Sequence, residues 1–278
     1  MLVNLKEILQ IAEKRKCAIG AFNTPNMTTL KAVIAAAEER GEPVIIMHAQ
    51  VHEEMGLCTM EEIVPLMVFF AKRAKVPVCV HLDHGEDLNY VKRGLELGCS
   101  SVMYDGSALG EEENAANTRI AVEYAKAFGA SVEAEVGSMG SRESSSAGEQ
   151  DESIYTDPET AASFVRETGI DALACAFGTV HGVYLREPKL DFDRLAKIKE
   201  LVNVPLVMHG GSGVSAADYK KVIALGIRKI NYYTYMSKAG ANAVVALEDK
   251  TFFHDIELAA QRGIKEDVAT AMAVFAGK

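Results

Sequence analysis

Three histidines, His84, His181 and His209, have the chemistry and the placement of metal ligands. Each lies at or just after the end of a different short β-branched run, and segments of helical length separate these runs. Three imidazoles that converge from separate strands leave a fourth coordination position open, which is the arrangement of a catalytic zinc ion. We therefore predict a metal site with zinc preferred, although iron and cobalt also accept imidazole ligands.

Acidic residues accompany these histidines. Asp83 directly precedes His84, so its carboxylate could transfer a proton at a substrate hydroxyl near the metal, or orient a histidine. Asp105 and Glu135 belong to the next two runs. We expect them to form a second cation site or to orient the metal-binding histidines, and Asp105 could instead cap a helix.

A glycine-rich turn at 210–213 follows His209 directly, and a helix is predicted to begin near Ser215. Backbone N–H groups and a helix N-terminus attract phosphate, and barrel enzymes often bind phosphate after their seventh and eighth strands. Asn231 and Thr234, at the end of the last run, are predicted to complete this phosphate site.

The remaining histidines and one lysine are weaker candidates. His48 and His52 follow the second run and could contact substrate. Strand alternation predicts that His81 points away from the barrel interior or lies behind the metal ligands, and His254 is predicted to be structural or exposed. Lys229 lies within the last run without an evident partner, so a Schiff-base mechanism is not favoured.

Eight runs that alternate with helical segments must position these residues. This pattern predicts a parallel sheet, and eight strands close it into a (β/α)8 TIM barrel that forms one domain over residues 1–278. An open doubly wound sheet is the alternative, but the first run lacks the glycine fingerprint expected there. The predicted strands are 18–23, 43–49, 76–84, 99–106, 131–137, 171–178, 204–211 and 227–233.

Helix-length segments lie between the strands, at 28–40, 59–74, 111–129, 157–169 and 215–226, and residues 1–16 predict an amphipathic helix. Thr59 and Asp157 are expected N-caps, and Gly129 and Gly169 are expected C-terminal caps. The polar segment 138–153 is too long for an ordinary connection, so we interpret it as a lid or site loop. The alternative is a disordered surface segment without a functional role.

Composition excludes several classes of function. A formal charge of −10 argues against a nucleic-acid partner, and no apolar stretch is long enough for a membrane span. The five cysteines are scattered and form no CxxC pair, which is typical of reduced thiols in a cytoplasmic protein. A zinc site beside a phosphate site predicts a reaction class. The metal would act as a Lewis acid on a carbonyl and stabilise an enediolate, and the neighbouring carbon–carbon bond would be made or broken.

Seven segments resemble the class II (zinc) ketose-bisphosphate aldolases, especially the fructose- and tagatose-bisphosphate branch, from about residue 3 to the end. They are AFN at 21, HLDHG at 81, VMYDGS at 102, EAEVG at 133, GTVHG at 178, MHGGSG at 208 and NYYT at 231. The resemblance implies a lyase that releases dihydroxyacetone phosphate, and a cytoplasmic homodimer or homotetramer.

The resemblance also implies roles for individual residues. Asp83 would be the proton donor, and Glu143 would exchange the C3 proton of dihydroxyacetone phosphate. His84, His181 and His209 would bind Zn2+, with Asp105 and Glu135 at a second or alternate metal position. A monovalent cation (Na+ or K+) often lies near the phosphate. The implied substrate-binding residues are Asn23, Gly182, Gly210, Gly211, Ser212, Asn231, Tyr232, Tyr233 and Thr234.

Three departures concern the aldehyde side. Ala49 stands where the family usually has a small hydroxyl residue, Tyr235 follows Thr234 where an acid is common, and the sequence printed ends without the Ser/Arg-bearing tail that contacts a far phosphate. Fructose or tagatose 1,6-bisphosphate is the default substrate. A mono-phosphorylated one, such as 6-phospho-5-dehydro-2-deoxygluconate, is the alternative. A metal-dependent isomerase or hydrolase, or a non-catalytic protein on the same barrel, is less favoured.

Overall fold

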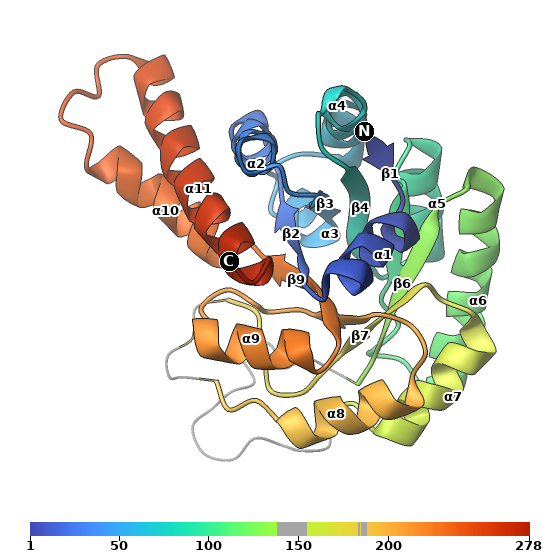
Figure 1. Ribbon diagram of the computed structural model, residues 1–278. Helices are drawn as coiled ribbons and strands as arrows, with labels where there is room; N and C mark the ends of the chain where they lie inside the picture. Colours follow the sequence, from blue (N-terminus) through green and yellow to red (C-terminus); the bar gives the residue numbers. More distant parts are fainter. Residues whose placement is uncertain (138–154, 183, 185–187) are drawn as a thin grey trace.

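The computed structural model of the protein describes residues 1–137, 155–182, 184 and 188–278 (Figure 1). Within these residues eight parallel strands form a ring, because β9 pairs with β2 and β4 pairs with β5. The predicted (β/α)8 TIM barrel is therefore confirmed. A short strand, β1 (Leu2–Val3), lies beside β4. The ring is made of β2 (Ile19–Asn23), β3 (Val44–Ala49), β4 (Val78–Gly85), β5 (Ser101–Tyr104), β6 (Ser131–Val136), β7 (Ala172–Cys175), β8 (Leu206–Met208) and β9 (Ile227–Tyr232).

Helices cover the outside of the ring in the described part of the chain (Figure 1). They are α1 (Leu5–Arg15), α2 (Met27–Arg40), α3 (Gln50–Glu54), α4 (Met60–Arg73), α5 (Leu88–Glu96), α6 (Glu111–Phe128), α7 (Pro158–Thr168), α8 (Phe192–Leu201), α9 (Ala216–Ala224), α10 (Thr234–Val245) and α11 (Phe253–Phe275).

The predicted helix boundaries follow from local hydrogen bonding. The Thr59 and Asp157 side chains accept hydrogen bonds from backbone N–H groups in the first turns of α4 and α7. Gly129 and Gly169 end α6 and α7 with φ values of 66° and 70°, a left-handed conformation that costs glycine little. These caps were correctly predicted. The same signals did not reveal the pair α10 and α11, which contact each other and extend from the barrel (Figure 1).

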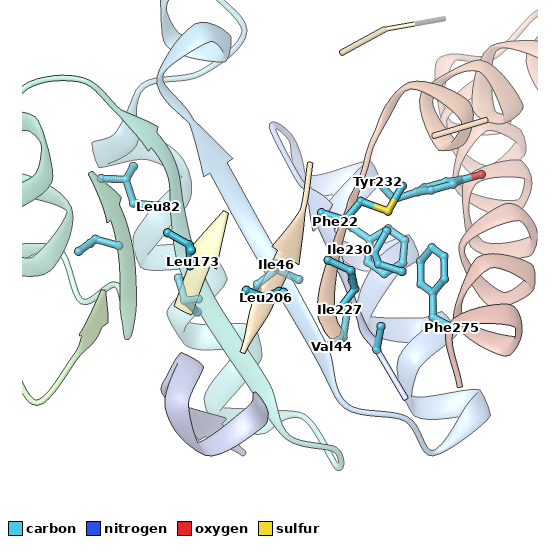
Figure 2. Packing of buried hydrophobic residues seen from close by; sticks show 14 of the residues in the cluster. Phe22, Val44, Ile46, Leu82, Leu173, Leu206, Ile227, Ile230, Tyr232 and Phe275 are labelled. Carbon is cyan, nitrogen blue, oxygen red and sulfur yellow. The ribbon is translucent and has the colours of Figure 1, made fainter. Parts of the chain in front are cut away.

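Strand alternation divides the apolar core into two layers. Residues such as Ile46, Leu173 and Leu206 point outward, into the layer between strands and helices (Figure 2). Their neighbours, such as Ile45, point into the barrel, where α1 closes one end with Leu5, Ile8 and Leu9. Each fully buried leucine or isoleucine contributes about 1.5–3 kcal/mol.

All eight strands run the same way, so their carboxyl ends meet at the rim opposite α1. This rim is where the predicted site residues must meet. Among the described residues, none of the helices has both the length and the apolar composition that a bilayer crossing requires.

Candidate metal centre and substrate cavity

A cavity of about 580 Å³ opens at the carboxyl ends of the strands. Every predicted site residue in the described part of the chain lines this cavity, except His209, which is fully buried beneath it. Predicted Glu143 lies outside the described residues. The tertiary structure therefore brings together side chains from seven different strands or the segments that follow them.

The three predicted metal-binding histidines converge. The ring centroid of His84 lies 5.2 Å from that of His181 and 4.6 Å from that of His209, and the last two are 6.0 Å apart. One ring nitrogen from each residue lies within 4.8 Å of the others. The histidines come from β4, from the segment after β7 and from the end of β8, so the barrel itself creates this cluster.

Carboxylates fix which nitrogen each histidine presents. Nδ1 of His84 lies 2.6 Å from Asp105 Oδ2, and Nε2 of His209 lies 2.8 Å from Glu133 Oε1. The opposite nitrogens, His84 Nε2 and His209 Nδ1, consequently face each other at 2.9 Å. Two imidazole ligands of one tetrahedral zinc ion have nitrogens about 3.3 Å apart, so only a small shift would admit the ion.

The surrounding charge also suits a cation. Burial lowers the pKa of His84, but Asp83 and the hydrogen bond with Asp105 outweigh this effect and raise the pKa to about 10. The site thus favours a positive charge at His84. His84, Asp105 and Glu135 form a second group with ligand atoms within 4.8 Å of one another. The contact with His84 shows that Asp105 orients a histidine. The second cation site at Asp105 and Glu135 stays a prediction, which this second group of ligand atoms supports.

The end of β4 places Asp83 and His84 in the same cavity although they are sequence neighbours. Regular alternation would point them to opposite faces of the barrel. The register between β4 and β5 shifts between Leu82 and Gly85, and His84 adopts φ 49°, a left-handed conformation uncommon outside glycine. This irregularity turns the His84 side chain back toward the mouth. Such local strain is typical of functional sites.

Two amides hold the Asp83 carboxylate. Asn23 Nδ2 donates to Oδ2 at 3.0 Å, and Asn231 Nδ2 donates to Oδ1 at 3.0 Å. Burial raises the pKa of Asp83, but the nearby histidines and Lys229 outweigh it and leave this pKa well below its usual range. Both asparagines were predicted to bind substrate, and the structure shows that they also fix the predicted proton-transfer group.

A buried charged cluster beneath the histidines was missed from the sequence. Lys229 Nζ lies 3.0 Å and 2.9 Å from the two oxygens of Glu133, and both side chains are fully buried. The interpretation that Lys229 lacks a partner was therefore wrong. His81 points into the barrel, with Nε2 3.8 Å from Glu133 Oε2, so only its predicted place behind the metal ligands is confirmed.

The cluster fixes the charge of Glu133. Burial raises the pKa of Glu133, but Lys229 and the hydrogen bond with His209 lower it to about 2. An ionised Glu133 accepts a hydrogen bond from His209, which leaves Nδ1 of His209 free to bind metal. The signal was present in the sequence, because Glu133 and Lys229 are each two residues before a cavity residue on the same strand, Glu135 and Asn231.

Backbone contacts shape the predicted phosphate loop. Gly210 has φ 61°, and a Cβ at Gly211 would lie 2.7 Å from the carbonyl oxygen of Asn231. The Tyr184 hydroxyl donates to Gly210 O at 2.8 Å, and the Tyr219 hydroxyl donates to Gly211 O. Only glycine fits these positions, and the two tyrosines hold the loop carbonyls by hydrogen bonds.

The helix that follows the glycine-rich loop does not line the cavity. Ser215 caps α9 as predicted, but Ser215 is not a cavity residue, whereas Thr234, the first residue of α10, is one. The positive end of the α10 dipole is thus available to an anion. Tyr232 also lines the cavity, yet its ring packs against Phe22 and Phe275 in the outer core (Figure 2).

The two histidines of the β3 region differ. His48 is fully buried, with Nε2 3.0 Å from the Tyr90 hydroxyl, and does not line the cavity. His52, on α3, lines the cavity, and its ring centroid lies 4.9 Å from that of Tyr233. The suggested substrate contact is thus possible for His52 and wrong for His48. His254 is exposed, as predicted.

Comparisons with known proteins found similarity over nearly the whole chain. The family model described as class II fructose-bisphosphate aldolase matches residues 3–278. The Escherichia coli (strain K12) protein YdjI is 39% identical over 278 residues, which cover 99% of this chain and 98% of that protein. The crystal structure of the YdjI aldolase has a TM-score of 0.88 at 38% identity and covers 99% of this chain and 97% of its own. Sulfofructosephosphate aldolase of Alkalicoccus urumqiensis is 40% identical over 235 residues, 84% of this chain and 81% of that protein.

Proposed function

This chain belongs to the class II fructose-bisphosphate aldolase family, and on that premise we propose that it catalyses the zinc-dependent, reversible cleavage of a phosphorylated ketose to dihydroxyacetone phosphate and an aldehyde. The observation that carries this proposal is the convergence of His84, His181 and His209 beside a buried Asp83. We further propose that residues 1–278 act as one domain.

The three histidines would hold the zinc ion, with Asp105 and Glu133 fixing the orientation of two of them. When bound, zinc supplies Lewis acidity that polarises the ketose carbonyl and stabilises the negative charge developed as the carbon–carbon bond breaks. The chain's own residues must then bind the phosphate, orient the chain of carbons and move protons.

Asp83 would move the proton at the aldehyde-derived oxygen. Its lowered pKa keeps the carboxylate ionised, which is the form that accepts a hydroxyl proton during cleavage. The same group returns this proton in the direction of condensation. Asn23 and Asn231 would hold the carboxylate at a fixed position throughout, because each donates to one of its oxygens.

The loop at 210–213 and the start of α10 at Thr234 would bind the phosphate of dihydroxyacetone phosphate. The close packing of Gly210 and Gly211 against Val180 and Asn231 supports this role, since it fixes the position of a loop that lines the cavity. A sodium or potassium ion beside the phosphate is part of the proposal. Dependence of the Michaelis constant on K+ at constant ionic strength would test it.

Glu143 is proposed as the group that exchanges the C3 proton of dihydroxyacetone phosphate. Glu143→Ala should abolish exchange of this proton with deuterated water, measured by NMR, while dihydroxyacetone phosphate still binds with similar affinity. Persistent exchange would transfer the role to another acid of the same segment, Glu149 or Asp151.

The acidic rim bears on which ketose is cleaved. Fructose or tagatose 1,6-bisphosphate is the first candidate. Glu54 and Glu86 line the cavity near α3, and no lysine or arginine of the described residues does so. Like charges repel a second phosphate there more strongly than the single carboxylate of the second candidate, the mono-phosphorylated 6-phospho-5-dehydro-2-deoxygluconate, because a phosphate carries the larger charge.

A substrate panel with and without a chelator tests the proposal. We expect cleavage of at least one phosphorylated ketose, detected by a coupled assay for dihydroxyacetone phosphate. Removal of metal should abolish cleavage, and Zn2+ should restore it. Chelator-resistant cleavage would refute the zinc dependence, and strong preference for a bisphosphate would remove the second candidate.

The assembly and location of the protein are also proposed. We propose a cytoplasmic homodimer or homotetramer that acts on a small phosphorylated sugar and binds neither nucleic acid nor membrane. The formal charge of −10 supports the lack of nucleic-acid binding. Light scattering after size exclusion would test the oligomer, and a monomer at micromolar concentration would contradict it.

A further inference from the structure

We propose that His52 recognises a hydroxyl group on the aldehyde half of the ketose and is therefore a specificity-determining residue. This inference rests on the proposed aldolase function and extends it to the aldehyde half beyond the oxygen at which Asp83 would act. Sequence reasoning left His52 as one of two loosely placed histidines. The cavity gives it a definite position and environment.

The position of the aldehyde half follows from Asp83, which would move the proton at the aldehyde-derived oxygen. Ala49, the last residue of β3, is the register partner of Asp83 on β4. The residues that follow β3 therefore lie beside Asp83, and Ala49, Gln50 and His52 line the same cavity.

The His52 side chain is held in place and keeps hydrogen-bonding capacity. His52 is 4% exposed, and the centroid of its ring lies 4.9 Å from the ring centroid of Tyr233 at an interplanar angle of 58°. Nδ1 is buried and has no hydrogen-bond partner among the described residues. Buried polar groups are usually paired, so this imidazole keeps hydrogen-bonding capacity that no described protein group uses.

The helix that carries His52 is braced from its other side. The Glu53 carboxylate accepts a hydrogen bond from the Tyr90 hydroxyl at 3.0 Å and one from the Met60 backbone N–H at 3.1 Å. Tyr90 is in turn 3.0 Å from His48. A five-residue helix would otherwise be a poor support, and this network fixes His52 before substrate arrives.

The chemistry of the surroundings selects a hydroxyl partner. Burial lowers the pKa of His52 and the negative charge of Asp83 opposes this shift, so the imidazole is neutral near pH 7. A neutral imidazole can both donate to and accept from a hydroxyl group, whereas it offers an anion one N–H donor and no positive charge. Glu54 and Glu86 on the same rim further disfavour a negatively charged group, while Ala49 offers no side-chain hydrogen bond.

The test combines a substrate change with a residue change. Dihydroxyacetone phosphate is condensed with glyceraldehyde or with propanal, which has the same three carbons but no hydroxyl groups. The wild type should prefer glyceraldehyde by about 10- to 100-fold in kcat/KM, as expected where a site pairs with a substrate hydroxyl. His52→Phe keeps an aromatic ring against Tyr233 and should reduce this preference below about threefold.

A second readout separates specificity from damage to the metal or phosphate site. Exchange of the C3 proton of dihydroxyacetone phosphate requires no aldehyde, so His52→Phe should change its rate by less than about twofold. If this variant does not fold, His52→Leu, which also removes both ring nitrogens, replaces it. His254→Phe, a substitution of an exposed histidine, should leave the aldehyde preference and the exchange rate unchanged.

Two outcomes would overturn the inference, and they differ from failure of the proposed function. An unchanged aldehyde preference in His52→Phe, or an exchange rate that falls in parallel with condensation, would show that His52 does not read the aldehyde. A wild type that neither exchanges the C3 proton nor condenses either aldehyde, even with added zinc, would refute the aldolase function itself.

Discussion

The two ends of the cavity are built in different ways. At the β8–β9 end, the backbone of Gly210 and Gly211 packs so closely against Val180 and Asn231 that no Cβ would fit. At the β3 end, the short helix α3 lines the cavity with side chains such as His52 and Glu54. One end is therefore defined by backbone geometry and the other by side-chain identity.

This difference assigns the reaction and the choice of aldehyde to different parts of the cavity. A group bound by backbone and by a helix N-terminus cannot be exchanged without refolding the loop, so the phosphate end should keep one ligand. Side chains on α3 can change without disturbing the metal-binding histidines, which lie on β4, after β7 and after β8. Of the departures from the family pattern, Ala49 lies at the β3 end of the cavity, whereas Tyr235 belongs to α10 and lies against Gly213 of the phosphate loop. We therefore expect this enzyme to differ from its relatives in the aldehyde that it accepts.

The largest expected effect comes from the floor of the metal centre. His209→Ala removes one of three ligands, so bound zinc and cleavage activity should both be lost. Metal content by mass spectrometry and the coupled assay measure the two quantities. His254→Ala is the matched control on an exposed histidine. Full metal content in His209→Ala would contradict the ligand assignment.

Proton transfer should be separable from metal binding. Asp83→Ala should retain zinc, while kcat falls by roughly 10²–10⁴, the usual range for a general acid or base. Asp249→Ala, on an exposed loop, provides the control for loss of a carboxylate. If zinc content falls together with kcat, Asp83 supports the metal and its role in proton transfer is lost.

The buried pair beneath the histidines should have an intermediate effect. Glu133→Gln weakens the group that orients His209, so zinc affinity should fall by about 10–100-fold in a competition titration. Lys229→Met leaves Glu133 charged and unpaired, which should lower the free energy of unfolding by about 3–5 kcal/mol.

A double substitution of this pair gives the stricter test. Glu133→Gln combined with Lys229→Met should destabilise the protein by less than the sum of the single changes, because neither charge is then left alone. Lys6→Met, at an exposed ion pair with Asp171, should cost at most about 1 kcal/mol. Additive effects at Glu133 and Lys229 would show that the pair is not coupled.

The smallest effect is expected at the acidic rim. Glu86→Gln removes an exposed negative charge from the β3 end, so kcat/KM for a bisphosphate should rise about two- to fivefold relative to a mono-phosphate. The gain should shrink at high salt, because screening weakens charge interactions between exposed groups. Glu96→Gln, on the outer helix α5, is the control. An unchanged ratio at low salt would remove the rim from the account of specificity.

Residue patterns predicted the parts of this protein that depend on local order. The alternation of β-branched runs with helical segments predicted eight strands in a barrel, and the histidines at strand ends predicted where a metal would bind. Helix caps at Thr59, Asp157, Gly129 and Gly169 were predictable because each depends on hydrogen bonds within a few residues. The pair α10 and α11 was missed because its segments carry weak boundary signals.

The errors share one cause. Lys229 was judged to lack a partner, and His48 was placed with His52, because neither contact is local in the sequence. Glu133 lies 96 residues before Lys229, and Tyr90 lies 42 residues after His48. Likewise, alternation alone would have sent Asp83 and His84 to opposite faces, whereas the irregular end of β4 turns both into the cavity.

The sequence by itself therefore determined the barrel, its order of strands and the kinds of groups at its rim, because these follow from periodicity and short-range hydrogen bonding. Only the tertiary structure decided which nitrogen each histidine presents, which lysine neutralises which carboxylate and which histidine of the β3 region reaches the cavity. Those choices depend on distances between side chains far apart in the chain, and closure of the barrel is what brings such side chains within a few ångströms.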